Sequence, residues 1–345
     1  MKKFLSAILA GAMVLSMAAC GSAADDSAAE ATDTAAEATA EATEEAAPAA
    51  TSGEALRFVT GGESGTYYAF GSVIANHATN NAGISVTAIV GNGSQSNCQE
   101  LEDGTADLAF CQSDVMAYAY QGTNLFEETG AITCFSTVAA LYTEQVQIVT
   151  CDPEIKTVAD LAGKNVSIGA AGSGVYFNAI DILGAYGLTE DDINPTYQSF
   201  GDSADALKDG KIDAAFIVAG APTTAVTDLA TTKDVYLVSL DAEHVADLVA
   251  SSPYYAECTI GADVYGLDSD TVTVGVGAVI LANNNVSEDA VYALCADIFD
   301  NYESLTDSHA KYAELSFDYA TSITTVPYHP GAAKYFEEKG YTVAQ

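Results

Sequence analysis

The chain lacks tryptophan and is very poor in basic residues. Among 345 residues it has 11 lysines and arginines against 48 aspartates and glutamates, a formal net charge of −37. So acidic a chain repels the phosphate backbone of nucleic acids and the anionic surface of a membrane. We therefore expect no nucleic-acid partner, and membrane contact only through a lipid anchor. Aromatic packing depends on 19 tyrosines and 12 phenylalanines.

Arginine is almost absent, since Arg57 is the only one in the chain. A bidentate arginine clamp on a carboxylate ligand is therefore available from a single residue, at the start of the first expected strand. If the ligand is anionic, backbone N–H groups and hydroxyls must hold most of it.

Motifs for metal binding and catalysis are also missing. The histidines are scattered without H-E-x-x-H spacing, and no two cysteines form a C-x-x-C pair. Gly172-Ser173-Gly174 lacks the G-x-S-x-G spacing of a hydrolase nucleophile. We therefore expect no metal, no cofactor and no enzymatic activity. The histidines are His77, His244, His309 and His329. Beyond Cys20, six cysteines allow either three disulfides in fifteen pairings or buried thiols: Cys98, Cys111, Cys134, Cys151, Cys258 and Cys295.

The first 54 residues differ in composition from the rest. Lys2 and Lys3 precede an apolar stretch and then small residues before Cys20, the anatomy of a bacterial secretory signal. The apolar stretch is too short for a transmembrane helix of about 20 residues. A cysteine at this place resembles a lipobox, which implies cleavage before Cys20 and lipid on its sulfur; an ordinary signal peptide is the alternative.

We thus predict a signal peptide over 1–19 and a lipidated, disordered acidic tether over 20–54. Residues 21–54 contain no aromatic residue and are rich in alanine and acids, so they cannot bury enough apolar surface to fold. A partly helical tether is the alternative. The protein is expected to be extracytoplasmic, anchored by lipid to the outer face of the cell membrane.

From residue 56 onward, strand-like apolar segments alternate with helical segments. Strands are expected at 56–60, 84–90, 107–111, 132–141, 146–150, 165–169, 196–199, 213–218, 235–239 and 271–282. Helices are expected at 67–78, 94–101, 115–120, 158–161, 175–186, 203–208, 287–299 and 330–339, with another ending at 230. Ser94, Asp114 and Ser287 are expected helix caps. This alternation predicts an α/β fold with mostly parallel sheets flanked by helices.

A short pattern occurs twice. Residues 101–110 (LEDGTADLAF) resemble 207–216 (LKDGKIDAAF), each reading as a helix end, a glycine stop and an apolar strand. The repeat suggests two lobes built on one plan, and a cleft between two such lobes is a natural ligand site.

Several loops after the expected strands carry small polar residues where a helix begins. Ligands of open α/β sheets bind outside the carboxyl ends of the strands. Helix N-termini there offer free N–H groups and a partial positive charge. Five loops have this chemistry, at 61–66, 92–97, 112–114, 172–174 and 220–223, although any one alone can be merely a capped helix. The candidate ligand-binding residues are Ser64, Thr66, Tyr67, Ser94, Asn97, Gln112, Asp114, Tyr142, Glu144, Ser173, Gly174, Phe216, Gly220 and Pro222.

Four ordered segments resemble one family. GGESGTYY at 61–68 resembles the GTYY segment of the TAXI family, the solute-binding subunits of TAXI-type TRAP transporters. Residues 94–114 are similar to its G-S-x-x-N…L-x-x-G…D-x-A…Q-x-D run, LYTE at 141–144 to its L-Y-x-E segment, and HPGA at 329–332 to its ending. The resemblance covers essentially all of 56–345.

The resemblance implies a two-lobed type II periplasmic-binding fold with the ligand cleft between the lobes. Lobe 1 would comprise 56–145 plus 271–345, and lobe 2 would comprise 146–270. Residues 146–150 and the stretch near 266–272 would be hinge strands. Ligand would favour the closed form, which the TRAP membrane subunit would recognise.

The resemblance also implies a small organic acid or an amino acid as ligand. Glutamate or glutamine is preferred, because an acid such as Asp114 or Glu144 suits an α-ammonium group and loop N–H groups suit a carboxylate. We expect a monomer on its tether. The alternatives are a ligand-sensing lipoprotein for a two-component kinase and the binding protein of an ATP-driven transporter.

Overall fold

The computed structural model describes residues 53–345. The predicted signal peptide, Cys20 and the tether up to residue 52 lie outside the described residues. The strands are β1 (Ala55–Val59), β2 (Ser85–Ile89), β3 (Leu108–Gln112), β4 (Phe135–Thr150), β5 (Asn165–Ser167), β6 (Asn194–Thr196), β7 (Ala214–Ala219), β8 (Tyr236–Leu237), β9 (Ala256–Ile260) and β10 (Thr271–Asn283).

The α-helices are α1 (Thr66–Asn81), α2 (Ser94–Glu102), α3 (Ser113–Gln121), α4 (Val175–Ala185), α5 (Phe200–Lys208), α6 (Thr224–Ala230), α7 (Ala242–Ser251), α8 (Glu288–Asp300), α9 (Tyr302–Leu305), α10 (Phe317–Ala320) and α11 (Pro330–Glu338). Short 3-10 helices lie at Asn124–Phe126, Val158–Leu161, Glu190–Asp192, Ala262–Val264 and Ala310–Glu314.

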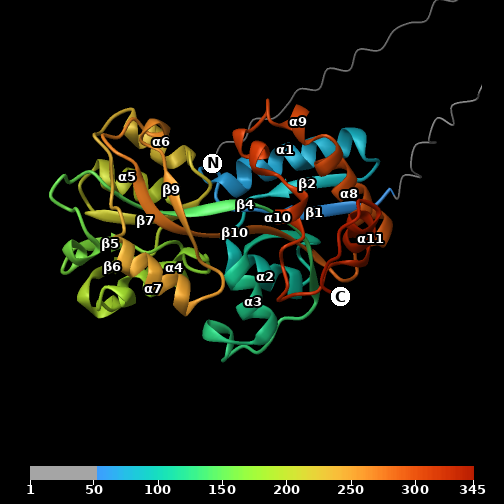
Figure 1. The fold of residues 1–345 in the computed structure, drawn as a ribbon, viewed down its shortest axis with the longest axis horizontal. Coiled ribbons are helices and arrows are strands. Elements are labelled where there is room, and N and C mark those ends of the chain that lie inside the picture. Colours follow the sequence, from blue (N-terminus) through green and yellow to red (C-terminus); the bar gives the residue numbers. More distant parts are fainter. Residues whose placement is uncertain (1–52) are drawn as a thin grey trace, which may run out of the picture. The chain divides into compact units, whose positions relative to one another are not determined.

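The strands form a mixed sheet in the order β2-β1-β3-β10-β4-β7-β5-β6, with β9 beside β10 and β8 beside β4. The pairs β1–β2, β1–β3, β5–β6 and β5–β7 are parallel, whereas β4 and β10 are antiparallel to each other and to their other partners. Figure 1 shows β4 and β10 running side by side between the two groups of parallel strands. The fold is therefore α/β with helices flanking the sheet, as the sequence predicted. The sheet is mixed, and not mostly parallel as expected, because β4 and β10 run antiparallel to all their partners.

The long strands β4 and β10 each run from one hydrophobic core into the other. On β4, Tyr142 belongs to the first hydrophobic core and Val146 to the second; on β10, Ala278 belongs to the first and Val276 to the second. We keep lobe 1 and lobe 2 with their predicted boundaries as a proposal. The crossing between the two cores lies close to residue 144.

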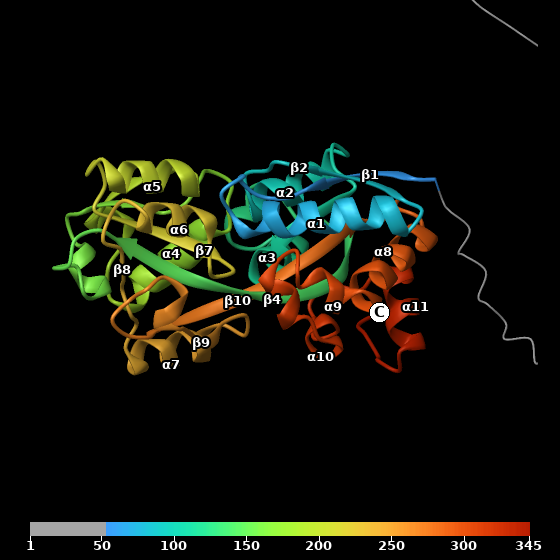
Figure 2. The same cartoon turned by 90° about the horizontal axis from the view of Figure 1, so that it is seen from above.

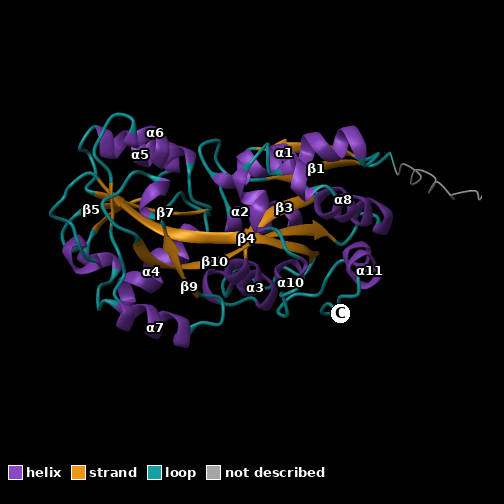
Figure 3. Ribbon diagram, turned by 45° about the horizontal axis from the view of Figure 1, so that its top comes forward, coloured by secondary structure: helices purple, strands orange, loops and turns teal. Residues whose placement is uncertain are grey.

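In lobe 2, alternate side chains of β7 pack against helices on opposite sides of the sheet. Phe216 and Val218 of β7 pack in the core that includes α4 and α7, while Ala215 and Ile217 pack in the core that includes α5 and α6. Alternate residues of a strand face opposite sides of the sheet. Figures 2 and 3 show the same arrangement, with α5 and α6 on one side of β7 and α4 and α7 on the other.

The repeated pattern is confirmed as helix, glycine and strand in both lobes. Helix α2 leads through Gly104 into β3, and α5 leads through Gly210 into β7. Both glycines have a left-handed backbone, with φ of 67° and 68°. This conformation ends a helix at little cost only for glycine.

Several local predictions were wrong. The two strands expected at 132–141 and 146–150 are one strand, β4, because the polar residues between them keep pairing with Gly275, Val276 and Gly277 of β10. Residues 266–270 belong to no strand. Ser94 and Asp114 are not N-caps: α2 and α3 begin after Gly93 and Gln112. Ser287 does cap α8, since its Oγ accepts from the N–H of Ala290 at 3.2 Å.

Candidate functional site

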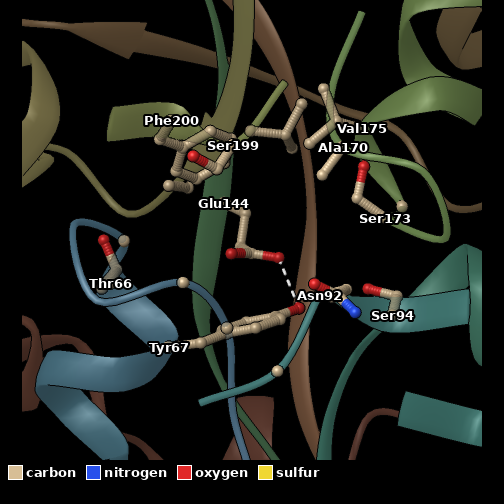
Figure 4. Close-up of a pocket in the computed structure, with 18 of the residues that line it drawn as sticks. Thr66, Tyr67, Asn92, Ser94, Glu144, Ala170, Ser173, Val175, Ser199 and Phe200 are labelled. Atoms are coloured by element: carbon tan, nitrogen blue, oxygen red, sulfur yellow. Dashed lines mark hydrogen bonds between the residues drawn. The ribbon is translucent and has the colours of Figure 1, made fainter. Parts of the chain in front are cut away.

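A cavity of about 290 Å³ lies between lobe 1 and lobe 2. Figure 4 shows Thr66, Tyr67, Asn92 and Ser94 on one side of it and Ala170, Ser173 and Phe200 on the other. The remaining lining residues are Gly61, Gly62, Glu63, Gly65, Val90, Gly91, Gly93, Gln112, Glu144, Gly174, Val175, Gln198, Ser199, Val218 and Ala219. The volume is at the low end for ligand pockets and fits a molecule of amino-acid size.

Four helices begin at the cavity. The loops after β1, β2, β5 and β6 line it, and these loops lead into α1, α2, α4 and α5. The first N–H groups of a helix lack partners within the helix and carry a partial positive charge. Among the described lining residues there is no lysine, arginine or histidine. An anion in this cavity would therefore be attracted by backbone N–H groups and helix dipoles.

Arg57 is engaged elsewhere. Its Nε and Nη2 donate to the Asp107 carboxylate at 2.9 and 2.8 Å, and Nη2 also donates to the carbonyl of Gly104. Asp107 stands just before β3, whereas the cavity lies beyond the carboxyl ends of the parallel strands. The one arginine thus stabilises lobe 1 and leaves the cavity without a guanidinium group.

Hydrogen bonds between the lobes hold the cavity in a closed form. The Thr66 hydroxyl donates to the carbonyl of Gly220 at 2.7 Å. Backbone bonds run from Ala225 N–H to the Ser64 carbonyl at 3.1 Å and from Ser96 N–H to the Gly172 carbonyl at 2.8 Å. Because partners come from both lobes, these bonds can form only when the lobes meet.

Glu144 lies at the floor of the cavity, where β4 passes between the lobes. The hydroxyl of Tyr67 donates to Glu144 Oε2 at 2.6 Å (Figure 4), and both side chains are buried. Tyr67 is held by stacking on Phe110, with ring centroids 4.5 Å apart. Burial raises the pKa of the Glu144 carboxyl well above its usual value, despite the Tyr67 hydrogen bond. Burial therefore favours a protonated Glu144, which a cationic ligand group would ionise.

Two buried polar atoms at the cavity have no hydrogen-bond partner among residues 53–345. They are Gln112 Oε1 and Ser173 Oγ, and their residues are 2 % and 6 % exposed. Leaving a buried polar atom unpaired costs about 1–3 kcal/mol. Ser94 is partly used, since its Oγ accepts from the Gln112 backbone N–H at 3.0 Å. Gln112 and Ser173 thus bring polar atoms without a partner to the wall of the cavity.

Seven of the predicted site residues do not line the cavity. Asn97 is buried and its Nδ2 donates to the carbonyls of Thr60 and Phe110. Tyr142 and Phe216 are fully buried core side chains that lie two residues along their strands from the lining residues Glu144 and Val218. The others are Ser64, Asp114, Gly220 and Pro222. Ser64 and Gly220 contribute their carbonyls to the lobe contacts described above.

The loop around Ser199 was not predicted from the sequence. Gln198, Ser199 and Phe200 line the cavity at the start of α5, although 196–199 was expected to be a strand. Ser199 caps the helix, since its Oγ accepts from Asp202 N–H at 3.2 Å. A serine three residues before an acid is a recognisable helix start. That spacing was the signal that could have revealed the loop.

Residues 53–345 contain neither a metal-binding cluster nor a disulfide. Within residues 53–345 no cluster of three or more His, Cys, Asp or Glu could hold a metal ion. All six cysteines in this range are free thiols, and Cys98 and Cys111 approach to 3.6 Å between sulfurs. No helix of the described part of the chain is long and apolar enough to span a bilayer.

Asp114 gives a testable pH dependence of stability. Burial raises the pKa of its carboxyl to about 6, despite hydrogen bonds from Val115 N–H and Asn178 Nδ2. The unfolded value is about 3.9. The folded protein therefore binds more protons between pH 4 and pH 6, and its stability falls as the pH rises through this window.

We expect wild type to lose about 2 kcal/mol of unfolding free energy relative to Asp114→Asn between pH 4 and pH 7. Guanidinium unfolding curves of the two proteins at matched pH measure this difference. A difference that stays constant with pH contradicts a buried carboxylate that must ionise.

A family model described as the NMT1-like family matches residues 58–340. Solved structures are also similar. The periplasmic aliphatic sulphonate binding protein SsuA from Escherichia coli is 18 % identical, over 83 % of this chain and 90 % of that one, with a TM-score of 0.45. AbpA of Streptococcus pneumoniae, an amino acid ABC transporter substrate-binding protein bound to L-arginine, is 14 % identical over 75 % and 96 %, with a TM-score of 0.45. The GluR0 ligand-binding core from Nostoc punctiforme, in complex with L-glutamate, is 16 % identical over 73 % and 97 %, with a TM-score of 0.44.

Proposed function

This chain belongs to the NMT1-like family, and we propose that it is an extracytoplasmic receptor that captures a small organic acid or amino acid between its lobes. The observation that carries the proposal is a closed cavity where four helices begin and where Gln112 Oε1 and Ser173 Oγ are buried without partners. Ligand that binds the closed form better than the open form shifts the population toward closure. The role is capture and delivery, with no chemical step.

We propose an amino acid resembling glutamate or glutamine as the ligand. Its carboxylate would accept from N–H groups at the helix starts, because no cationic side chain lines the described cavity. Its ammonium would face Glu144, the buried acid of the cavity floor. Asp114, the other acid considered for this role, does not line the cavity. Of the two acids, Glu144 is therefore the one that we assign to the ammonium.

For the partner, we propose the membrane subunit of a TAXI-type TRAP transporter, with the receptor anchored as a monomer through lipid on Cys20. The supports are the GTYY, Q-x-D, L-Y-x-E and H-P-G-A segments and the apolar stretch that ends at Cys20. Uptake by vesicles that hold the transporter tests the partner. Uptake driven by an ion gradient without ATP is expected, and a strict need for ATP contradicts it.

A thermal-shift screen tests the receptor role. The purified protein is unfolded and refolded to release co-purified ligand, and then melted with amino acids, dicarboxylates and sugars. A ligand at about 100 times its dissociation constant adds about 2.7 kcal/mol of stability. This amounts to a rise of roughly 2–4 °C in melting temperature for a chain of about this size. A rise with an amino acid and none with sugars is expected; no rise with any small acid or amino acid contradicts the proposal.

A further inference from the structure

Beside the cavity, a chain of buried side chains joins the two lobes. Gln112 Nε2 donates to Asn178 Oδ1 at 3.0 Å. Asn178 Nδ2 donates to Asp114 Oδ2 and to the hydroxyl of Tyr255, both at 2.9 Å. The Tyr255 hydroxyl donates to Asp181 Oδ2 at 2.9 Å. Gln112 and Asp114 belong to lobe 1, whereas the other three belong to lobe 2.

The carboxylates of Asp114 and Asp181 fix the direction of every hydrogen bond in this series of side chains. An ionised carboxylate only accepts, so Asp114 requires the NH2 group of Asn178 to face it. The oxygen of Asn178 must then face Gln112, and Gln112 must turn its own NH2 group toward Asn178. The oxygen of Gln112 is consequently turned away from Asn178, and it has no hydrogen-bond partner among residues 53–345. Asp114, Asn178 and Gln112 are at most 2 % exposed, so water does not relax the requirement.

We propose that Asp114, acting through Asn178, is a positioning residue that sets the hydrogen-bond character of the cavity by turning the acceptor atom of Gln112 toward the ligand. The proposal rests on the proposed function and deepens it. Gln112 lines the cavity and its Oε1 is the atom without a partner. A ligand that completes this site carries an N–H or O–H donor at that point, as an amino acid does and a simple dicarboxylate does not.

The position of Gly174 shows how closely the lobes meet at this atom. A Cβ built on Gly174 would lie 1.6 Å from Gln112 Oε1 and 2.9 Å from Ser94 Oγ. Glycine at the start of α4 therefore leaves just enough room for the amide of Gln112. Since Asn178 is on the same helix, closure brings the Gly174 backbone and the Asn178 side chain to Gln112 together.

Two isosteric substitutions separate orientation from packing. In Asp114→Asn the N–H of Val115 keeps the side-chain oxygen on its side, so the new NH2 group faces Asn178. Asn178 accepts from it by reversing its amide, while the Tyr255 hydroxyl turns from Asp181 to donate to the same Asn178 oxygen. Gln112 then reverses in turn and presents a donor to the cavity. Asn178→Asp is the matched control, because the oxygen facing Gln112 is kept and a proton shared with Asp114 replaces one of the two lost N–H donors, while the bond that Tyr255 accepted is lost. Each substitution exchanges a carboxylate oxygen and an amide NH2 group and leaves the volume of the side chain nearly unchanged.

The test uses L-glutamate and 2-oxoglutarate, which have the same carbon skeleton but place a donor or an acceptor at the same carbon. Dissociation constants are measured by calorimetry for wild type and both variants. Wild type is expected to prefer glutamate. Asp114→Asn is expected to reduce the ratio of the two constants at least 10-fold, while Asn178→Asp leaves it within about 3-fold. An unchanged ratio in Asp114→Asn overturns the proposal, since a merely structural residue alters both affinities equally.

A measurement without ligand separates this proposal from the proposed function. The side-chain amide of Gln112 is followed by NMR in 15N-labelled protein and assigned by its loss in Gln112→Glu. Slow exchange of its protons with solvent in wild type and in Asn178→Asp, and faster exchange in Asp114→Asn, are expected. Rapid exchange in wild type overturns the orientation. If neither probe binds wild type, the proposed ligand class fails, and the exchange rates still decide the orientation.

Discussion

Binding of an amino acid at pH 7 is expected to release about one proton from the protein. Burial raises the pKa of Glu144 well above its usual value, against the Tyr67 hydrogen bond and the charge of Lys311, and so favours the protonated carboxyl before a ligand cation binds. An ammonium group beside Glu144 stabilises the carboxylate and expels that proton. Calorimetric titration in phosphate and in Tris, buffers with different ionisation enthalpies, gives the number of protons released.

Glu144→Gln is expected to abolish the proton release and to weaken amino-acid binding roughly 100-fold, about 2.8 kcal/mol. The amide keeps the size of the side chain and can still accept from Tyr67, so the fold is preserved. Glu128→Gln, at an exposed acid outside the cavity, is the matched control and should bind as wild type does. Equal affinity of Glu144→Gln and wild type contradicts the ammonium site.

Gly174→Ala is expected to weaken ligand binding roughly 10- to 100-fold by opposing closure. The added methyl group would lie 1.6 Å from Gln112 Oε1, across the contact between the lobes. Overpacking of this kind costs about 1–3 kcal/mol. The backbone of Gly174 has φ −73° and ψ −18°, which alanine adopts without strain. The cost therefore applies to the closed form, in which the lobes meet.

Gly184→Ala in the same helix is the matched control. A Cβ on Gly184 would meet no heavy atom within 4 Å, and alanine inside a helix is favoured over glycine by about 1 kcal/mol. This variant should melt at a higher temperature and bind as wild type does. Calorimetry and thermal melting of both variants measure the two effects. Unimpaired binding by Gly174→Ala shows that the ligand does not need this closed form.

The α/β architecture could be predicted because its local signals agree with one another. Apolar runs alternate with capped helices, and the repeated Gly104 and Gly210 stops mark the same turn in both lobes. The long strand β4 could not be predicted whole. Its polar residues Thr143, Glu144 and Gln145 resemble a loop in sequence. They continue the strand because they pair with β10, and the hydroxyl of Tyr67 provides a hydrogen-bond partner for the buried Glu144.

Part of the cavity could also be predicted from local sequence signals. Polar residues at helix starts can be recognised in sequence, and Thr66, Ser94 and Ser173 do line the cavity. Whether a polar side chain faces the ligand or another side chain depends on contacts across the lobes. Asn97 and Asp114 belong to the same motif as Gln112, yet their partners are a backbone carbonyl and Asn178. Asn178 itself lies in an apolar helix and gave no sequence signal.

Calorimetric titration of the refolded protein with L-glutamate, L-glutamine and succinate tests whether the cavity binds an amino acid. We expect one molecule of an amino acid bound per chain, and weaker binding of succinate, because the cavity joins helix N-termini for a carboxylate to Glu144 and Gln112 for a donor. Binding of succinate with no binding of either amino acid would contradict the ligand assignment. Absence of binding by all three would contradict the receptor itself.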